Sequence, residues 1–165
     1  SSNYKNYANV LHKFTCNYPE NWSELSRDQL IKKSKNQYSP PEDLVVAFVS
    51  PVNFDDNVNI QVTQVDEENL SDKDIEDTIK ELDKVYPENY PDFKKIKSGI
   101  VTINGAKGLE YIYSSTRLGV PLQQRVLILV KSKRAYTITF TALKEHFEKL
   151  DNRIFQPFLE SFRIQ

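Results

Sequence analysis

The sequence is short of the residues that form covalent links, phosphate-binding loops and membrane spans. Its 165 residues include one cysteine, four glycines and no methionine. Cys16 has no second cysteine to pair with, so a disulfide within the chain is excluded. No Walker, Rossmann or nucleophile-elbow pattern occurs, which excludes the usual phosphate loops and hydrolase motifs. No apolar run reaches about 18 residues, so no membrane-spanning helix is predicted.

The residues that are present fit one folded domain. Hydrophobic residues make up 39% of the chain and charged residues 27%, and a chain of this length buries roughly two-thirds of its unfolded surface. We therefore expect a single domain over residues 1–165. The formal net charge of -1 predicts no attraction to nucleic acid. The start at Ser1, without a methionine, suggests a processed chain that has lost an N-terminal segment.

Apolar patterns predict three strands in the first half of the chain. Residues 11–18 predict a strand that leads into a turn at Tyr18–Asn21, which Trp22 anchors. The continuous apolar run Leu44–Val49 predicts the central strand, buried on both faces. Residues 58–62 alternate between apolar and polar types, which predicts a strand with one wet face.

Helical spacing appears twice. Ser71 and the acids after it, including Asp74, favour a helix start, because acids stabilise a first turn. The apolar stripe of this helix ends at Pro87. Residues 147–162 predict a helix, a break and a last helix with Pro157 in its first turn.

The stretch between these helices predicts an antiparallel meander. Residues 96–142 divide into four strands with short turns between them. In the last strand, Tyr136, Ile138 and Phe140 share one face and threonines occupy the other. A sheet with one aromatic face and one polar face is therefore expected.

Three segments carry a resemblance to a known family. They are Phe14–Trp22, Ala135–Ala142 and Phe155–Ile164. Together they resemble the PsbP family, within the wider Mog1/PsbP-like group. The resemblance implies an α+β fold, the Mog1/PsbP-like α/β/α sandwich, in which helices flank both faces of a mostly antiparallel sheet. It also implies an extracytoplasmic location and a non-enzymatic role as a binding or assembly subunit.

The charges of the chain are segregated along the sequence. Residues 66–92 contain 11 acids and three lysines, whereas residues 94–165 contain 13 basic and five acidic residues. A near-neutral total thus hides two segments of opposite sign, which predicts a charge-segregated surface. Helix starts gather acids and sheet surfaces gather lysines, so each segment also has a purely structural explanation.

Each charged segment supplies candidate binding residues. An EF-hand starting at Asp72 is excluded, because Asp77 stands where the loop needs glycine. Weak divalent-cation binding at the acidic segment stays open. On the basic segment, a predicted hairpin and its neighbouring strands suggest a patch suited to an acidic protein, lipid headgroups or nucleic acid. A solvated turn that blocks edge pairing would look the same. The cation candidates are Asp66, Glu67, Glu68 and Asp72, and the partner candidates are Arg117, Arg125, Lys131, Lys133 and Arg134.

Residues suited to catalysis are scarce. His12 and Cys16 lie four apart on one predicted strand, roughly 13 Å from each other, too far for a dyad. Cys16 is better explained as a buried small hydrophobe, and His146 as a solvated histidine. An enzyme would need a deep polar cleft near residues 66–72.

Together with these observations, the resemblance to the PsbP family implies a non-enzymatic extracytoplasmic subunit without cofactors. We expect a monomer at the cell surface or on a lipid anchor, which binds a protein partner through charged residues. Two alternatives stay open: an intracellular Mog1-like adaptor for a small GTPase, and a weak divalent-cation-binding surface protein.

Overall fold

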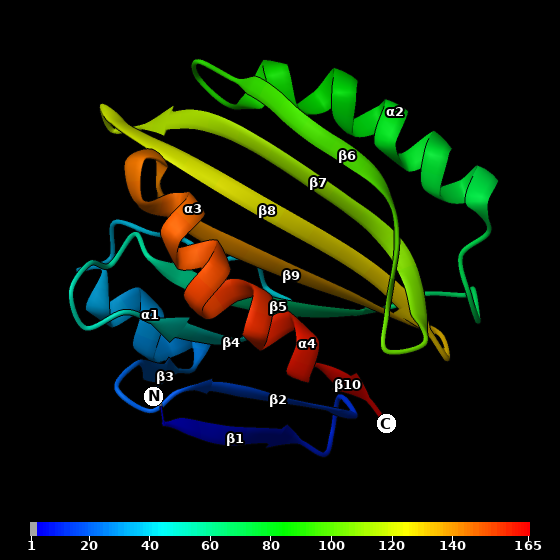
Figure 1. Ribbon diagram of the computed structural model, residues 1–165, viewed down its shortest axis with the longest axis horizontal. Coiled ribbons are helices and arrows are strands. Elements are labelled where there is room, and N and C mark those ends of the chain that lie inside the picture. Colours follow the sequence, from blue (N-terminus) through cyan, green and yellow to red (C-terminus); the bar gives the residue numbers. More distant parts are fainter. Residues whose placement is uncertain (1–2) are drawn as a thin grey trace.

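A seven-stranded antiparallel sheet forms the centre of the fold (Figure 1). The structure is a computed structural model, and it describes residues 3–165. A smaller three-stranded sheet lies beside the large one. The order of the large sheet is β3 (Ser23–Leu25), β4 (Leu44–Val49), β5 (Asn57–Gln64), β9 (Arg134–Leu143), β8 (Val120–Lys131), β7 (Ala106–Arg117) and β6 (Lys94–Ile103). The order of the small sheet is β1 (Tyr4–Asn9), β2 (Phe14–Pro19) and β10 (Arg163–Ile164).

Helices pack on both faces of the large sheet, as the resemblance implied. The two on one face are α1 (Arg27–Lys33) and α2 (Asp72–Asn89). On the other face, a C-terminal helical segment crosses β9 (Figure 1). It comprises a 3₁₀ turn at residues 144–146, α3 (Phe147–Leu150), a π-helical turn at residues 151–155 and α4 (Gln156–Ser161). None of the helices within residues 3–165 is both long and apolar enough to cross a bilayer.

The two faces of the large sheet differ in composition, as the alternation along the last strand predicted. Tyr136, Ile138 and Phe140 of β9 face the C-terminal helical segment and β2, and they belong to the largest core cluster. We call this the sealed face. The threonines between them point to the opposite face, which α2 covers over β7 and α1 covers over β4. We call this the open face, because neither helix covers the part of the sheet between them, where polar side chains line a cavity.

Three predicted elements are present but differ from the prediction in their place in the sheet, their end or their continuity. The strand Leu44–Val49 is confirmed, but it lies next to the edge strand β3, and β9 is the central strand instead. Helix α2 begins after Ser71, whose side chain accepts a hydrogen bond from Asp74 N, but it continues through Pro87. The last turn persists because Tyr86 packs on β7. The predicted break in the last helix is a π-helical turn, which keeps the segment continuous.

The three hairpins of the meander close through two-residue turns whose residues have left-handed backbone. Such turns match the twist of the strands and favour Asn-Gly, which occurs in the first of them. All three turns place at least one non-glycine residue at positive φ. The φ values are 48° and 86° at Asn104 and Gly105, 52° and 80° at Leu118 and Gly119, and 53° and 64° at Ser132 and Lys133.

Candidate functional site

The predicted basic patch does not come together, because Arg125 lies inside the protein. Its side chain is 10% exposed. The guanidinium donates to Glu110 Oε2 at 2.8 Å, to Asp151 Oδ1 at 2.9 Å and to Gln156 Oε1 at 2.8 Å. Position 125 pairs with Phe140 on β9 and therefore faces the sealed side. The expectation that Arg125 meets a partner is wrong, since Arg125 links the sheet to the C-terminal helical segment.

The remaining basic candidates occupy opposite ends of β8. Arg117 pairs with Val120 at the first residue of β8, and Lys131 pairs with Arg134 at its last residue. Strands rise about 3.3 Å per residue, so the two turns are roughly 35 Å apart. Lys131, Lys133 and Arg134 do share one turn, which we call the basic hairpin tip. Arg117 is separate and forms an ion pair with Asp55 at 3.1 Å.

The opposite charges that are segregated in the sequence meet in space. Helix α2 places Asp83 against Lys95 of β6, with 2.9 Å between oxygen and nitrogen, and Asp72 against Lys107 of β7. The acidic loop before α2 lies along the basic hairpin tip, where Ser132 N donates to the carbonyl oxygen of Glu68 at 2.9 Å. The prediction that acidic and basic side chains occupy separate surfaces is therefore wrong for these elements.

The acidic cation candidates do not converge as ligands. Asp66, Glu67 and Glu68 lie on an exposed loop, and Asp72 is engaged by Lys107. Within residues 3–165 no three His, Cys, Asp or Glu side chains are grouped in a way that could hold a metal ion.

The residues weighed for catalysis are also apart. His12 lies in the turn before β2, not on the strand as predicted, and its carbonyl oxygen accepts a hydrogen bond from Tyr136 Oη at 2.6 Å. Cys16 is 1% exposed on β2, and burial raises the pKa of its thiol. A thiol that resists ionisation is a poor nucleophile, so its packing explains its presence. His146 lies on the surface beside Glu145.

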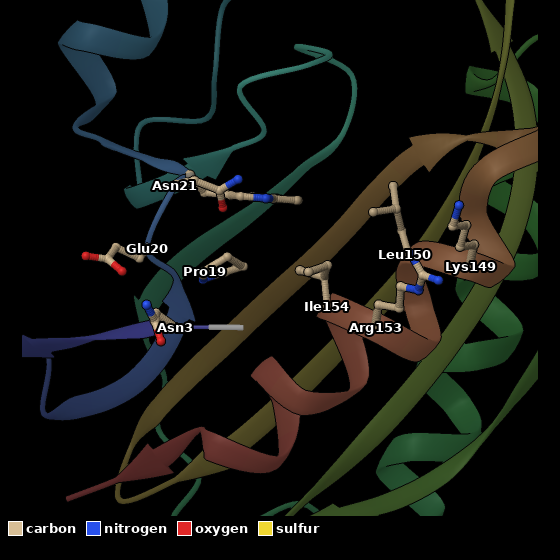
Figure 2. Close-up of a pocket in the computed structure, with 9 residues that line it drawn as sticks. Asn3, Pro19, Glu20, Asn21, Lys149, Leu150, Arg153 and Ile154 are labelled. Carbon is tan, nitrogen blue, oxygen red and sulfur yellow. The ribbon is translucent and has the colours of Figure 1, made fainter. Parts of the chain in front are cut away.

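An open groove runs between the turn after β2 and the C-terminal helical segment (Figure 2). Its volume is about 790 Å³. Figure 2 shows two facing walls. Asn3, Pro19, Glu20 and Asn21 lie on one side, and Lys149, Leu150, Arg153 and Ile154 lie on the other. We call this the turn–helix groove.

The turn–helix groove combines apolar contacts with charge of mainly one sign. Trp22 also lines it, and the half-buried Leu150 and Ile154 offer apolar surface on the helical wall. Lys149 and Arg153 are exposed on the same wall and lie four residues apart, so they share one helix face. Sequence reasoning found the Tyr18–Asn21 turn and the helix, but their sequence separation concealed that they face each other.

A second hollow lies on the open face between α1 and the turn that joins β7 to β8. Its volume is about 320 Å³. The floor is formed by Asn57, Asn59, Gln124 and Thr141, and the rim carries Arg117 with residues that follow α1. We call it the open-face cavity. None of the floor residues was a candidate from the sequence, where they appeared only as the polar half of an alternating pattern.

The sequence of the chain matches a family profile described as PsbP-like protein over residues 1–164. The chain belongs to the PsbP-like protein family. The match spans nearly the whole sequence, so the resemblance drawn from three packing segments is confirmed. None of the curated proteins matches the chain significantly.

Solved structures with this fold come from several organisms. Cyanobacterial PsbP (CyanoP) from Synechocystis sp. PCC 6803 matches with a TM-score of 0.70 and 10% identity, over 100% of this chain and 94% of that one. The Ran-binding protein Mog1p of Saccharomyces cerevisiae matches at 0.54 and 10%, over 99% and 96%. LpqN of Mycobacterium tuberculosis, described as involved in cell envelope biogenesis, matches at 0.55 and 14%, over 92% and 83%.

At these identities the solved structures establish the fold alone. They confirm the Mog1/PsbP-like architecture predicted from the sequence.

Proposed function

We propose that this PsbP-like chain is a non-enzymatic, extracytoplasmic binding subunit that holds an extended acidic segment of a protein partner in the turn–helix groove. The observation that carries the proposal is the helical wall, where Lys149 and Arg153 stand beside Leu150 and Ile154. Apolar side chains of the segment would cover Leu150, Ile154 and Trp22, and its carboxylates would meet the two cations. Buried apolar contacts supply affinity, and rim charges supply orientation and speed of association.

The proposed extracytoplasmic location has support from one structural neighbour. LpqN carries the same fold and is described as involved in cell envelope biogenesis. The likeness to the Ran-binding protein Mog1p favours a second candidate, an intracellular adaptor for a small GTPase. Fractionation of the source cells separates the two: recovery with the envelope or medium supports the first candidate, and recovery in the cytosol supports the second.

Photo-cross-linking tests the groove itself. A photoreactive residue replaces Asn21 on one groove wall or Lys133 on the basic hairpin tip, and the chain is irradiated in extract of its source cells. We expect a protein adduct from position 21 that disappears when Lys149→Glu and Arg153→Glu are introduced. Both side chains are exposed, so these changes should leave the fold intact.

The basic hairpin tip is the matched comparison surface. Charge reversal of Lys131, Lys133 and Arg134 should leave the position-21 adduct unchanged if the partner occupies the groove. An adduct that forms from position 133, and that is lost only on reversal of the hairpin residues, would move the partner to the tip and contradict the groove.

A further inference from the structure

Two asparagines that line the open-face cavity carry buried acceptor atoms without a hydrogen-bond partner in the described part of the chain. Asn57 and Asn59 both line the cavity, and neither Oδ1 oxygen has a hydrogen-bond partner within the described residues 3–165. Asn57 is 8% exposed, and its Nδ2 donates to Phe54 O at 3.0 Å, so the orientation of its amide is fixed. Buried polar atoms are nearly always paired. Both oxygens are closed off from solvent, so the polar surface that a ligand can reach is supplied by the other groups that line the cavity.

Hydrogen bonds within the sheet hold another polar side chain of the floor in place. Gln124 Nε2 donates to Thr141 Oγ1 at 2.9 Å, and Gln124 Oε1 accepts from the hydroxyl of Tyr113. These bonds fix the Gln124 side chain on β8 and leave the Thr141 hydroxyl hydrogen free to donate. The floor is thus held in place by the sheet before any ligand arrives, as in preformed small-molecule sites.

The rim has the opposite electrostatic character. Three cations border the cavity, namely Lys33, Lys35 and Arg117, and Asp55 is the one acid among its lining residues. Asp55 holds Arg117 Nη2 at 3.1 Å, which orients the guanidinium at the mouth. The excess of positive charge suits an anionic group at the outer end of a ligand.

Unfavourable backbone conformations occur on both sides of the mouth. Lys35 and Asn36, just after α1, have φ values of 57° and 61°, and Leu118, in the turn opposite, has 52°. Leucine is poorly suited to left-handed backbone, and this side chain is 91% exposed. The φ of Leu118 belongs to a two-residue hairpin turn like that at Ser132 and Lys133, so this side of the mouth is shaped by the turn.

We infer that the open-face cavity binds a small hydroxylated anion of the sugar phosphate or sugar acid class. Its phosphate or carboxylate pairs with Arg117, Lys33 and Lys35, and its hydroxyl groups contact the polar side chains of the floor. The volume of about 320 Å³ equals that of roughly ten water molecules at ~30 Å³ each, which accommodates one sugar ring with a charged substituent. This site lies on the open face and does not share lining residues with the turn–helix groove.

An NMR titration of the isotopically labelled chain tests the inference. The probes are glucose 6-phosphate, glucuronate, glucose and inorganic phosphate, each at millimolar concentration. We expect saturable shifts at Asn57, Asn59, Gln124 and Thr141 with one of the hydroxylated anions. Glucose lacks the anionic group and inorganic phosphate lacks the sugar hydroxyls, so each should bind at least about tenfold more weakly.

Two variants make the result decisive. Arg117→Gln should weaken the anion about tenfold, because it removes a charge-assisted contact at an exposed position where the fold is not at risk. Lys131→Gln, at the far end of β8, should leave the affinity unchanged. The inference is overturned if neither hydroxylated anion saturates, if glucose or phosphate alone binds equally well, or if Arg117→Gln and Lys131→Gln behave alike.

Discussion

The two faces of the central sheet are built from the same strands and serve different purposes. On β9, Phe140 points to the sealed face and is fully buried, whereas Thr141 points to the open face and lines a cavity. The sealed face is covered by the C-terminal helical segment and the small sheet, whose side chains form one continuous core. The open face is covered only toward its edges, by α1 and α2.

This difference indicates how the chain combines stability with recognition. Apolar packing on the sealed face, and under α1 and α2 on the open face, supplies the free energy of folding, so the part of the sheet between these two helices can keep polar groups unpaired. Neither proposed site interrupts the core of the sealed face. The turn–helix groove lies at the edge of this core, and the open-face cavity lies on the opposite face of the sheet. Variants on the two faces should therefore separate loss of stability from loss of binding.

The largest expected effect is on the sealed face. Phe140→Ala should lower the free energy of unfolding by about 3 to 5 kcal/mol, because it opens a cavity among packed rings. Thr139→Ala, one residue away on the open face, should cost less than about 1 kcal/mol. Urea denaturation measures both, and equal losses would remove the distinction between the faces.

The next effect concerns the buried link between the sheet and the C-terminal helical segment. Arg125→Met leaves Glu110, whose side chain is 8% exposed, without its partner. We expect a loss of roughly 2 to 3 kcal/mol, below the value for a fully buried pair because Asp151 is partly exposed. Arg117→Gln, which breaks an exposed pair with Asp55, should cost about 0 to 1 kcal/mol. A larger loss at Arg117 than at Arg125 would contradict this assignment.

The α2 side of the open face should show an alkaline transition. Burial raises the pKa of Tyr86 to about 12, and the neighbouring Tyr90 adds to the shift. A phenol whose pKa is higher in the folded state stabilises the fold fully below its unfolded pKa near 10, and this contribution is lost as pH rises toward 12. The loss should reach at most about 3 kcal/mol. In Tyr86→Phe the fall in stability over this pH window should be shallower, and an unchanged slope would contradict the assignment.

The smallest effect is at the helix caps of the open face. Ser71→Ala removes the acceptor for Asp74 N at the start of α2 and should cost about 1 kcal/mol. Ser26→Ala removes the matching acceptor for Gln29 N at the start of α1 and should cost a similar amount. Thermal denaturation measures both changes. A loss near that of Phe140→Ala would mean that the covers of the open face, and not the aromatic core, hold the fold.

The periodicity of apolar residues predicted most of the strands and helices, because it depends only on residues that are close together in the sequence. The strand Leu44–Val49, the strand around Val58–Val62 and the four-stranded meander were all predicted. Strand β1 was missed, because its burial is slight and it pairs only with β2. The order of the strands also escaped prediction, since it depends on pairing between segments far apart in the sequence.

The sites were harder to predict than the fold, because each is made by residues from distant segments. Arg125 looked like a surface cation until its carboxylate partners from β7 and the C-terminal helical segment were in place. The acidic and basic segments looked separate until α2 lay along β6 and β7. The orphan oxygens of Asn57 and Asn59 have no signature in the sequence at all.

The division between a face that folds and a face that binds has one direct test. Unfolding free energy and affinity for the hydroxylated anion are measured together for Arg117→Gln and Phe140→Leu. We predict that Arg117→Gln loses about tenfold in affinity with at most ~1 kcal/mol of stability, and that Phe140→Leu loses about 1 kcal/mol or more while keeping its affinity. A loss of affinity in Phe140→Leu, with full binding in Arg117→Gln, would contradict the division.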